Sequence, residues 1–226
     1  MSIYRRSFNL VFALSQLFTK LVKRLRWLTG RGWSGVEFEN RYAASREDAW
    51  GYLKSPLHAE RVARILARVP ENIAGTLLEV GCAEGFVTKQ LSPRARHVVG
   101  CDLSQEAIQR AQRYCEGLSN LQFHCVDIRH QIPADDVHVC LVSDVIYYLS
   151  AREIREFATE LSSRMCATGL LVIANEWNTG YRELTHPENA VQRIGETGHW
   201  RRISLEHHAQ GEEASHWIAV FEVMKE

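Results

Sequence analysis

The chain has 226 residues, enough for one sizeable domain with an extension. Its 27 Lys and Arg residues balance 27 Asp and Glu residues, so it lacks the overall basic field that draws polynucleotides, and we expect no nucleic-acid partner. The six cysteines are widely spaced without a Cys-x-x-Cys pair, which disfavours structural zinc and is typical of reduced thiols in the cytoplasm.

The first expected element is an amphipathic, basic helix within residues 1–30. Apolar residues recur at helical spacing from Val11 to Leu28, and Lys and Arg side chains supply a second face. The apolar stretch is too short to span a bilayer, and no small-residue cleavage site follows it. Two interpretations stay open: the helix packs on the domain or a partner, or residues 5–28 make peripheral contact with an anionic membrane.

Residues 31–70 are expected to form a cap on the substrate side of the domain. A Gly-rich linker at 29–35 leads into a polar segment, rich in aromatic residues, that reaches Ser55. Pro56 then begins a helix with apolar residues at regular spacing, and Pro70 ends it.

Residues 71–226 are expected to form the ligand-binding domain. Strands are predicted near 76–80, 97–101, 121–126, 137–143 and 169–174, with helices near 85–92, 104–116 and 151–165. Continuous apolar strands separated by helices predict an α/β fold: a parallel sheet with helices on both faces and every carboxyl strand end on one edge. Two strand-like runs at 199–208 and 215–223 predict a C-terminal antiparallel hairpin, which gives a mostly parallel, seven-stranded, Rossmann-like sheet.

Acidic residues at successive strand ends predict a nucleoside site on that edge. The run at 79–86 reads Glu-Val-Gly-Cys-Ala-Glu-Gly-Phe, a buried strand that breaks into a small-residue turn and opens a helix. Asp102 lies 21 residues after Gly81, where a carboxylate can accept both ribose hydroxyls. Asp127 ends the next strand and can accept from an adenine amine, while the amide of Ile128 donates to the ring.

A nicotinamide dinucleotide fits this turn poorly. Its fingerprint is Gly-x-Gly-x-x-Gly, and Phe86 stands where the third glycine belongs. We expect Glu84 to face the phosphates, which disfavours a pyrophosphate and favours a ligand with sulfonium and ammonium groups. A nicotinamide-dependent oxidoreductase is therefore the alternative that this turn disfavours.

The turn resembles the first motif of the class I S-adenosylmethionine-dependent methyltransferases, an acid followed by Gly-x-Gly-x-Gly. Glu79, Gly81 and Gly85 match this motif, and Ala83 replaces its middle glycine. The resemblance implies S-adenosylmethionine as cofactor and S-adenosylhomocysteine as product. The residues then expected to bind the cofactor are Glu79, Gly81, Cys82, Ala83, Gly85, Phe86, Asp102, Leu103, Asp127, Ile128 and Ser143.

Two further segments are similar to stretches of the nodulation N-methyltransferases (NodS-like) and their small-molecule relatives. They are the Trp-Gly-Tyr segment at 50–52 and the Asp-Val-Ile-Tyr-Tyr-Leu run at 144–149. This resemblance implies methylation of an amine or hydroxyl on a small molecule or glycan. The alternatives are an O-methyltransferase of a natural product or membrane-associated glycan or lipid intermediate, and a non-catalytic binding protein on the same fold.

The expected mechanism is an in-line displacement that needs no metal and depends on placing the nucleophile about 3 to 3.5 Å from the methyl carbon. Asp144, after the fourth strand, is the candidate for orienting or deprotonating the acceptor. Tyr147 and Tyr148 are candidates for the acceptor wall, and Glu176, after the fifth strand, for acceptor contact. The ordinary structural alternatives are a helix-capping acid for Asp144, a core ring for one of the two tyrosines and a loop position for Glu176. The sequence indicates no particular oligomeric state.

Overall fold

A seven-stranded sheet forms the centre of the computed structural model, which describes residues 35–45, 47–53, 55–177, 185–210 and 214–225. The strands are β1 (Ile73–Val80), β2 (Ala95–Asp102), β3 (Leu121–Cys125), β4 (Val137–Ser143), β5 (Met165–Trp177), β6 (Trp200–Gln210) and β7 (Ala214–Val223). They are arranged in the order β3-β2-β1-β4-β5-β7-β6. Strand β7 is antiparallel to both neighbours and the other pairs are parallel, which confirms the predicted fold.

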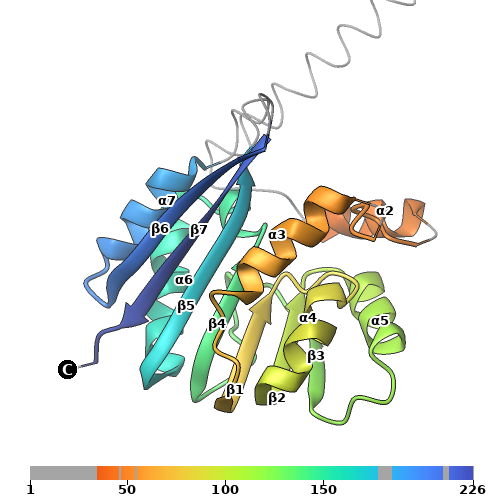
Figure 1. Cartoon of the computed structure of the whole chain (residues 1–226), viewed down its shortest axis with the longest axis horizontal. Coiled ribbons are helices and arrows are strands. Elements are labelled where there is room, and N and C mark those ends of the chain that lie inside the picture. Colours follow the sequence, from red (N-terminus) through yellow and green to blue (C-terminus); the bar gives the residue numbers. More distant parts are fainter. Residues whose placement is uncertain (1–34, 46, 54, 178–184, 211–213, 226) are drawn as a thin grey trace, which may run out of the picture.

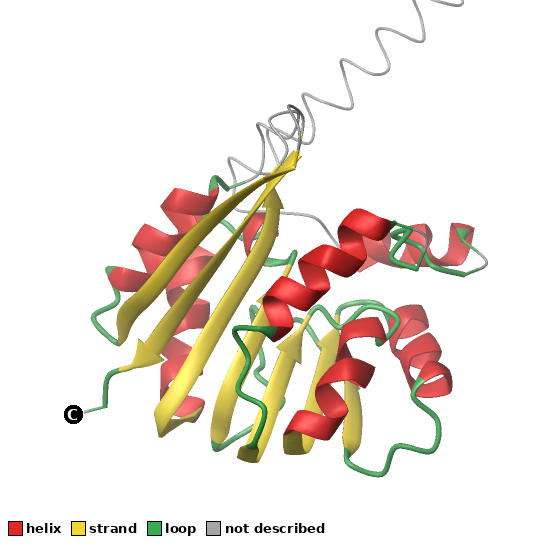
Figure 2. Cartoon of the chain, in the orientation of Figure 1, coloured by secondary structure: helices red, strands yellow, loops and turns green. Residues whose placement is uncertain are grey.

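Helices cover both faces of the sheet (Figure 1, Figure 2). Helices α3 (Pro56–Leu66) and α4 (Phe86–Leu91) lie on one face, and α6 (Ala151–Arg164) and α7 (Pro187–Gly195) lie on the other. Helix α5 (Gln105–Tyr114) packs beside β2 and β3. Helix α2 (Gly35–Ala44) lies beyond the carboxyl ends of the strands.

The core has an apolar layer on each side of the sheet. Leu77 packs with Ile65 of α3 on one side, while Leu78 packs with Phe157 of α6 on the other. Successive side chains of a strand point to opposite faces, so a strand that is covered on both sides must be apolar throughout. This is why the continuous apolar runs in the sequence located the central strands.

Local capping signals place the helices that carry the site. The Ser55 side chain accepts a hydrogen bond from the amide of His58 at the start of α3, where Pro56 occupies the first turn. Ser104 accepts from Ala107 at the start of α5 in the same manner. Ser150 and the third residue of α6 form a reciprocal capping box.

The structure differs from the predicted elements at three places. Strand β5 runs from Met165 to Trp177, beyond the expected 169–174, because Met165 pairs with Val137 of β4 and the outer half pairs with β7 as far as Trp177. Helices α2 and α7 were not predicted as helices. In α2 the buried residue is Tyr42, so the segment offers little apolar periodicity.

Strand β6 forms one open edge of the sheet. Its pairing with β7 shifts register between Arg202 and Ser204, and Ile203 at that irregularity is 54% exposed. The helix expected within residues 1–30 lies outside the described residues. Among those that are described, none of the helices combines the length and apolar composition needed to cross a bilayer.

Candidate functional site

A cavity of about 370 Å³ opens at the carboxyl ends of the parallel strands, below α2. This volume falls in the range of about 300–1,000 Å³ that is typical of small-ligand sites. The strand ends and the loops after them contribute Val80, Gly81, Ala83, Cys101, Asp102, Leu103, Val126, Asp127, Ile128, Arg129, Ser143, Asp144, Val145, Tyr147, Tyr148, Leu149 and Glu176. The N-terminal segment contributes Phe38, Arg41, Tyr42, Trp50, Tyr52, His58 and Arg61.

The turn after β1 is held in a conformation that requires glycine. Gly81 has a φ of 77°, and a Cβ at this position would lie 2.2 Å from Cγ2 of Val145. The amides of Gly81 and Cys82 both donate to the carbonyl of Cys101, at 2.8 and 3.0 Å. The backbone of the turn therefore approaches the strand ends closely, and no side chain at 81 stands between it and a ligand.

Asp102 is fixed at the end of β2 by two backbone amides. Its Oδ2 accepts from Ala83 N at 3.1 Å and its Oδ1 accepts from Ser104 N at 2.9 Å. Burial raises the pKa of Asp102 to about 6, against the lowering effect of these amides. The carboxyl group is thus ionised at neutral pH, faces the cavity and has lone pairs left for ligand hydroxyls.

Asp127 lines the cavity but is not free. Arg129 donates to its carboxylate through Nε, at 2.9 and 3.0 Å, and through Nη2 at 2.6 Å. Burial opposes ionisation, but the Arg129 hydrogen bonds prevail and hold the pKa of Asp127 below its ordinary value. A ligand amine at this position would share the carboxylate with Arg129, a partner that sequence reasoning did not identify.

Four of the residues expected to bind cofactor do not line the cavity. Glu79 is 2% exposed and accepts from Oγ1 of Thr88 at 2.5 Å, and burial raises its pKa to about 7. Cys82 is buried, Gly85 precedes the first turn of α4, and the Phe86 ring packs 4.8 Å from a neighbouring ring on α5. These residues lie under or behind the turn, where they support its shape.

The prediction that Glu84 faces the ligand is wrong. Its side chain is 4% exposed and lies 2.9 Å from Nη1 of Arg110, and it also accepts from the amide of Ala49 at 3.1 Å. The charge of the carboxylate is balanced by Arg110 inside the protein. The argument against a pyrophosphate therefore rests on the missing third glycine at Phe86 and not on the charge of Glu84.

Asp144 is held by a guanidinium from α3. Arg61 forms an ion pair with its carboxylate and lies 3.3 Å from Oγ of Ser143, and the amide of Glu176 donates to Oδ1 of Asp144 at 2.8 Å. Asp144 also has a φ of 55°, the left-handed region that a non-glycine residue rarely adopts. Its carboxylate is consequently fixed and paired, which suits it to orienting a group and makes it a poor free base.

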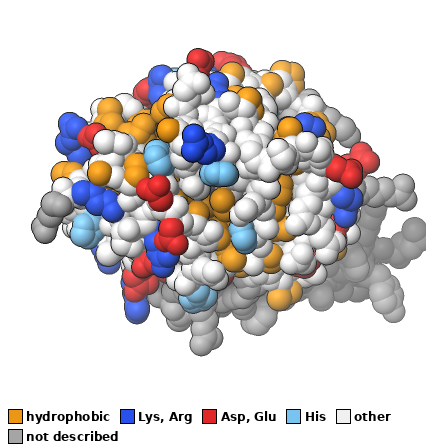
Figure 3. Space-filling view, turned by 90° about the horizontal axis from the view of Figure 1, so that it is seen from below, with side chains coloured by type: hydrophobic (Ala, Val, Ile, Leu, Met, Phe, Trp, Pro, Cys, Tyr) orange, Lys and Arg blue, Asp and Glu red, His pale blue; other side chains and the backbone are white. Residues whose placement is uncertain are grey.

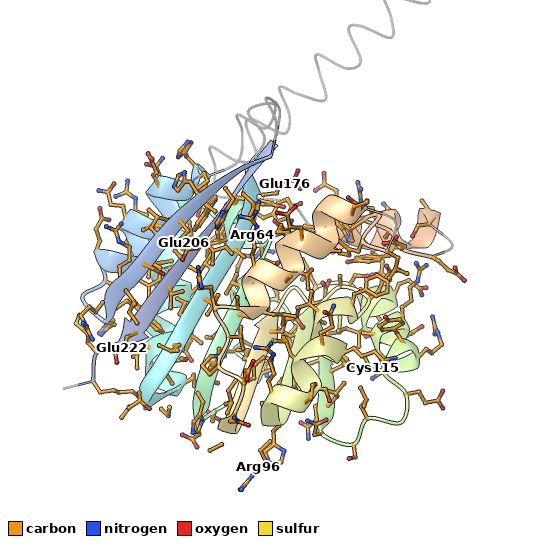
Figure 4. The ribbon with its side chains drawn as sticks, viewed as in Figure 1. Arg64, Arg96, Cys115, Glu176, Glu206 and Glu222 are labelled. Atoms are coloured by element: carbon orange, nitrogen blue, oxygen red, sulfur yellow. The ribbon has the colours of Figure 1, made fainter. Side chains whose placement is uncertain are left out.

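Glu176 stands nearer the mouth of the cavity. Figure 4 places it at the upper end of β5, near α3. Its side chain is 54% exposed, and its carboxylate is 4.0 Å from Nη1 of Arg61. Its carboxylate is therefore accessible to solvent at the mouth.

Aromatic rings form another part of the cavity wall. Tyr147 and Tyr148 lie 4.5 Å apart between ring centroids, and Phe38 meets Tyr148 edge-on at 5.1 Å. The His58 ring lies 3.9 Å from that of Tyr52. Burial, and after it the charge of the nearby arginine on α3, lower the pKa of His58 to about 4, so its imidazole is neutral at physiological pH.

Sequence reasoning missed the contributions of Phe38, His58 and Arg61. Phe38 belongs to a helix without a clear apolar period, and the other two occupy the polar face of α3, which looks like a solvent-exposed face in sequence. The Trp50 and Tyr52 segment was singled out only through its family resemblance.

The charge pattern adds no further site. Within the described ranges no group of three or more His, Cys, Asp or Glu side chains is close enough together to hold a metal ion. On the face seen in Figure 3, acidic and basic side chains are interspersed, in line with the balanced composition. This face presents no single-sign surface of the kind that binds polynucleotides.

Comparison with known proteins gives consistent similarities. A profile of the methyltransferase domain family matches residues 77–169. Nodulation protein S of Sinorhizobium fredii (strain NBRC 101917 / NGR234) is 25% identical over 156 residues, or 67% of this chain and 72% of that protein. Malonyl-[acyl-carrier protein] O-methyltransferase of Bacillus cereus is 23% identical over 145 residues, or 63% of this chain and 52% of that protein.

Similarity also extends to a solved structure. The crystal structure of N-methyltransferase NodS from Bradyrhizobium japonicum WM9 in complex with S-adenosyl-L-homocysteine superposes with a TM-score of 0.74. The superposition covers 85% of this chain and 100% of that chain, at 20% sequence identity.

Proposed function

We propose that this member of the class I S-adenosylmethionine-dependent methyltransferases transfers a methyl group to an amine of a small molecule or glycan. The transfer is in line and needs no metal. The observation that carries the proposal is the cavity at the strand ends, which joins Gly81 and Asp102 to the paired Asp144 and the aromatic wall. Bound S-adenosylmethionine supplies an electrophilic methyl group on a sulfonium.

The residues present fit this cofactor. The turn at Gly81 is a cradle that a Cβ would fill, and it leaves backbone exposed to the methionine portion. The half-buried Asp102 carboxylate can accept the two ribose hydroxyls. Asp127, shared with Arg129, and the amide of Ile128 would recognise adenine, and Leu103 and Ser143 also line the cavity.

An amine suits the acceptor side better than a hydroxyl. A neutral amine attacks with its own lone pair, whereas a hydroxyl needs a base as it attacks. Asp144 is already ion-paired with Arg61, which supports its role in orienting the acceptor over a role in taking its proton. Glu176 at the mouth can attract a protonated amine, which must give up its proton to solvent before it attacks, and Tyr147 and Tyr148 can pack against its carrier.

O-methylation is the second candidate, and His58 is the observation that favours it. This neutral imidazole lines the cavity and can accept the proton of a hydroxyl. Similarity to an O-methyltransferase supports the same alternative. Its acceptor would be a natural product or a membrane-associated glycan or lipid intermediate.

Calorimetry with S-adenosylmethionine and S-adenosylhomocysteine tests the cofactor. We expect both to bind, Asp102→Ala to weaken binding at least tenfold (about 1.4 kcal/mol), and Asp135→Ala, a surface change beside Arg164, to leave it unchanged. Absence of binding to the wild-type protein would overturn the proposal. Mass spectrometry after incubation with candidate amines and alcohols would then locate the transferred methyl group.

Residues 5–28 lie outside the described residues, and vesicle flotation separates their two interpretations. Peripheral membrane contact requires the full chain, and not a chain lacking residues 1–28, to float with anionic vesicles. If both stay in solution beside those vesicles, the membrane interpretation fails.

A further inference from the structure

The roof of the cavity is a separate piece of the chain. We call residues 35–45 and 47–53 the cap; it contributes Phe38, Arg41, Tyr42, Trp50 and Tyr52 to the cavity wall. None of its described residues belongs to a strand of the sheet. The position of the cap therefore depends on the side-chain and backbone contacts that it makes with the elements below it.

Arg110 of α5 is the main attachment of the cap. Its Nη2 donates to the carbonyls of Tyr42 and Ser45, both at 2.9 Å, and its Nη1 donates to Oγ of Ser45 at 3.1 Å. The last carbonyls of a helix have no partner within the helix, and a guanidinium at this end satisfies them and opposes the negative end of the helix dipole. Arg110 thus holds the end of α2 in place.

Glu84 joins this attachment to the cofactor turn. One carboxylate oxygen accepts from Nη1 of Arg110 at 2.9 Å and the other accepts from the amide of Ala49 in the cap at 3.1 Å. The Glu84 side chain is 4% exposed and that of Arg110 is 13% exposed. The pair therefore connects the turn at 81–85, helix α5 and the cap within one shielded network.

Three further hydrogen bonds fix the parts of the cap relative to each other and to α5. Nε1 of Trp50 donates to the hydroxyl oxygen of Tyr42 at 2.8 Å, and both rings line the cavity. Glu39 accepts from the hydroxyl of Ser104 and from the amide of Glu106. Movement at the end of α2 would therefore carry the roof aromatic residues with it.

We propose that Glu84 and Arg110 are positioning residues whose ion pair couples closure of the cap to the cofactor turn. Neither side chain lines the cavity, yet the pair sets the affinity for the cofactor. This inference rests on the proposed function for the identity of the ligand. A cap that is closed only part of the time raises the apparent Kd by the inverse of the closed fraction. Removal of Arg110 leaves the shielded Glu84 carboxylate without its cation, and removal of Glu84 leaves Arg110 with Glu106 as its remaining carboxylate partner. In both cases the link between the turn and the cap through this pair is lost, which favours opening.

The test compares Arg110→Met with Arg113→Met, which removes the same charge from an exposed position on the same helix. Calorimetry with S-adenosylhomocysteine is expected to show about a tenfold higher Kd for Arg110→Met, as for a cap closed about a tenth of the time, and no change for Arg113→Met. Hydrogen exchange should accelerate at the amides of residues 42–50 and stay unchanged in β1 and β4. A merely structural defect would accelerate exchange in the sheet as well.

A double variant tests whether the two residues act as one unit. Glu84→Gln should weaken binding, and Glu84→Gln with Arg110→Met should bind no more weakly than the worse single variant. If the increase in Kd of the double variant equals the product of the two single increases, the coupling is overturned. An Arg110→Met protein with unchanged affinity, or with unchanged hydrogen exchange at 42–50, would also overturn it. If the wild-type protein binds no S-adenosylhomocysteine, the proposed function fails, and hydrogen exchange still decides whether Arg110 holds the cap.

Discussion

Gly81→Ala is expected to destabilise the protein by two separable effects. The first is the positive φ of 77°, which costs a residue with a Cβ about 1–2 kcal/mol. The second is the contact of the new Cβ with Cγ2 of Val145 at 2.2 Å, an overpacking for which about 1–3 kcal/mol is typical. Together they predict a loss of about 2–5 kcal/mol in the free energy of unfolding.

Two other variants separate these effects. Gly117→Ala has a φ of 87° with nothing within 4 Å of the new Cβ, so it should lose only the backbone part, about 1–2 kcal/mol. Val145→Ala removes the clashing methyl group, so the double variant with Gly81→Ala should be more stable than the sum of the single effects by about 1–3 kcal/mol. Urea unfolding, followed by circular dichroism, gives each free energy.

The reasoning is refuted if Gly81→Ala and Gly117→Ala lose the same stability, because the clash would then have no energetic consequence. It also fails if Val145→Ala recovers nothing in the double variant. Binding of S-adenosylhomocysteine by each folded variant adds an independent check. Gly81→Ala should weaken binding, since the turn must shift to relieve the contact, whereas Gly117→Ala should bind normally.

Three further predictions concern buried charges. Burial raises the pKa of Glu79 from 4.5 to about 7, so its stabilising contribution is complete below pH 4.5 and is lost as pH rises through 7. The free energy of unfolding of Glu79→Gln should therefore rise relative to that of the wild type by up to about 3 kcal/mol between pH 4.5 and pH 8. Equal shifts of the urea midpoint at the two pH values would contradict this. For His216 the dependence of stability on pH has the opposite sign. Burial, and after it the charge of His208, lower the pKa of His216 from 6.5 to about 4, so wild-type stability falls as pH drops from 6.5 towards 4. His216→Gln should flatten that part of the stability profile. Asp144→Asn leaves the Arg61 guanidinium with only the more distant Glu176 carboxylate, at 4.0 Å, and should cost up to about 3–5 kcal/mol. Arg61→Met should add less than its own single effect, and additive losses in thermal melts would argue against the pair.

The central fold follows from the sequence because its signals are local. Apolar runs such as the one ending at Val80 are continuous because both of their faces are covered. Ser104 and Ser150 mark helix starts by a hydrogen bond to a residue three positions on. The outer half of β5 was missed because its extent is set by pairing with β7, which lies far along the chain.

The cavity could be predicted in part for the same reason. Asp102, Asp127 and Asp144 follow successive strands, and topology alone brings the ends of parallel strands to one edge. What these acids contact could not be predicted, because Arg61 reaches Asp144 from 83 residues away and sits on the polar side of an amphipathic helix. Glu84 was misassigned likewise, since its partner on α5 is 26 residues further along.

The irregular pairing at Ile203 has a consequence for how copies of the protein can associate. An open sheet edge offers unpaired amides and carbonyls to any extended chain, and regular, flat edges are prone to uncontrolled strand addition. Strand β6 breaks that regularity between Arg202 and Ser204 and places two consecutive arginines just before the break. Exposed arginine side chains, of which Arg201 is paired with Glu222 of β7, and a locally twisted backbone would meet if two such edges approached, so growth of a continuous sheet across molecules is disfavoured on this side.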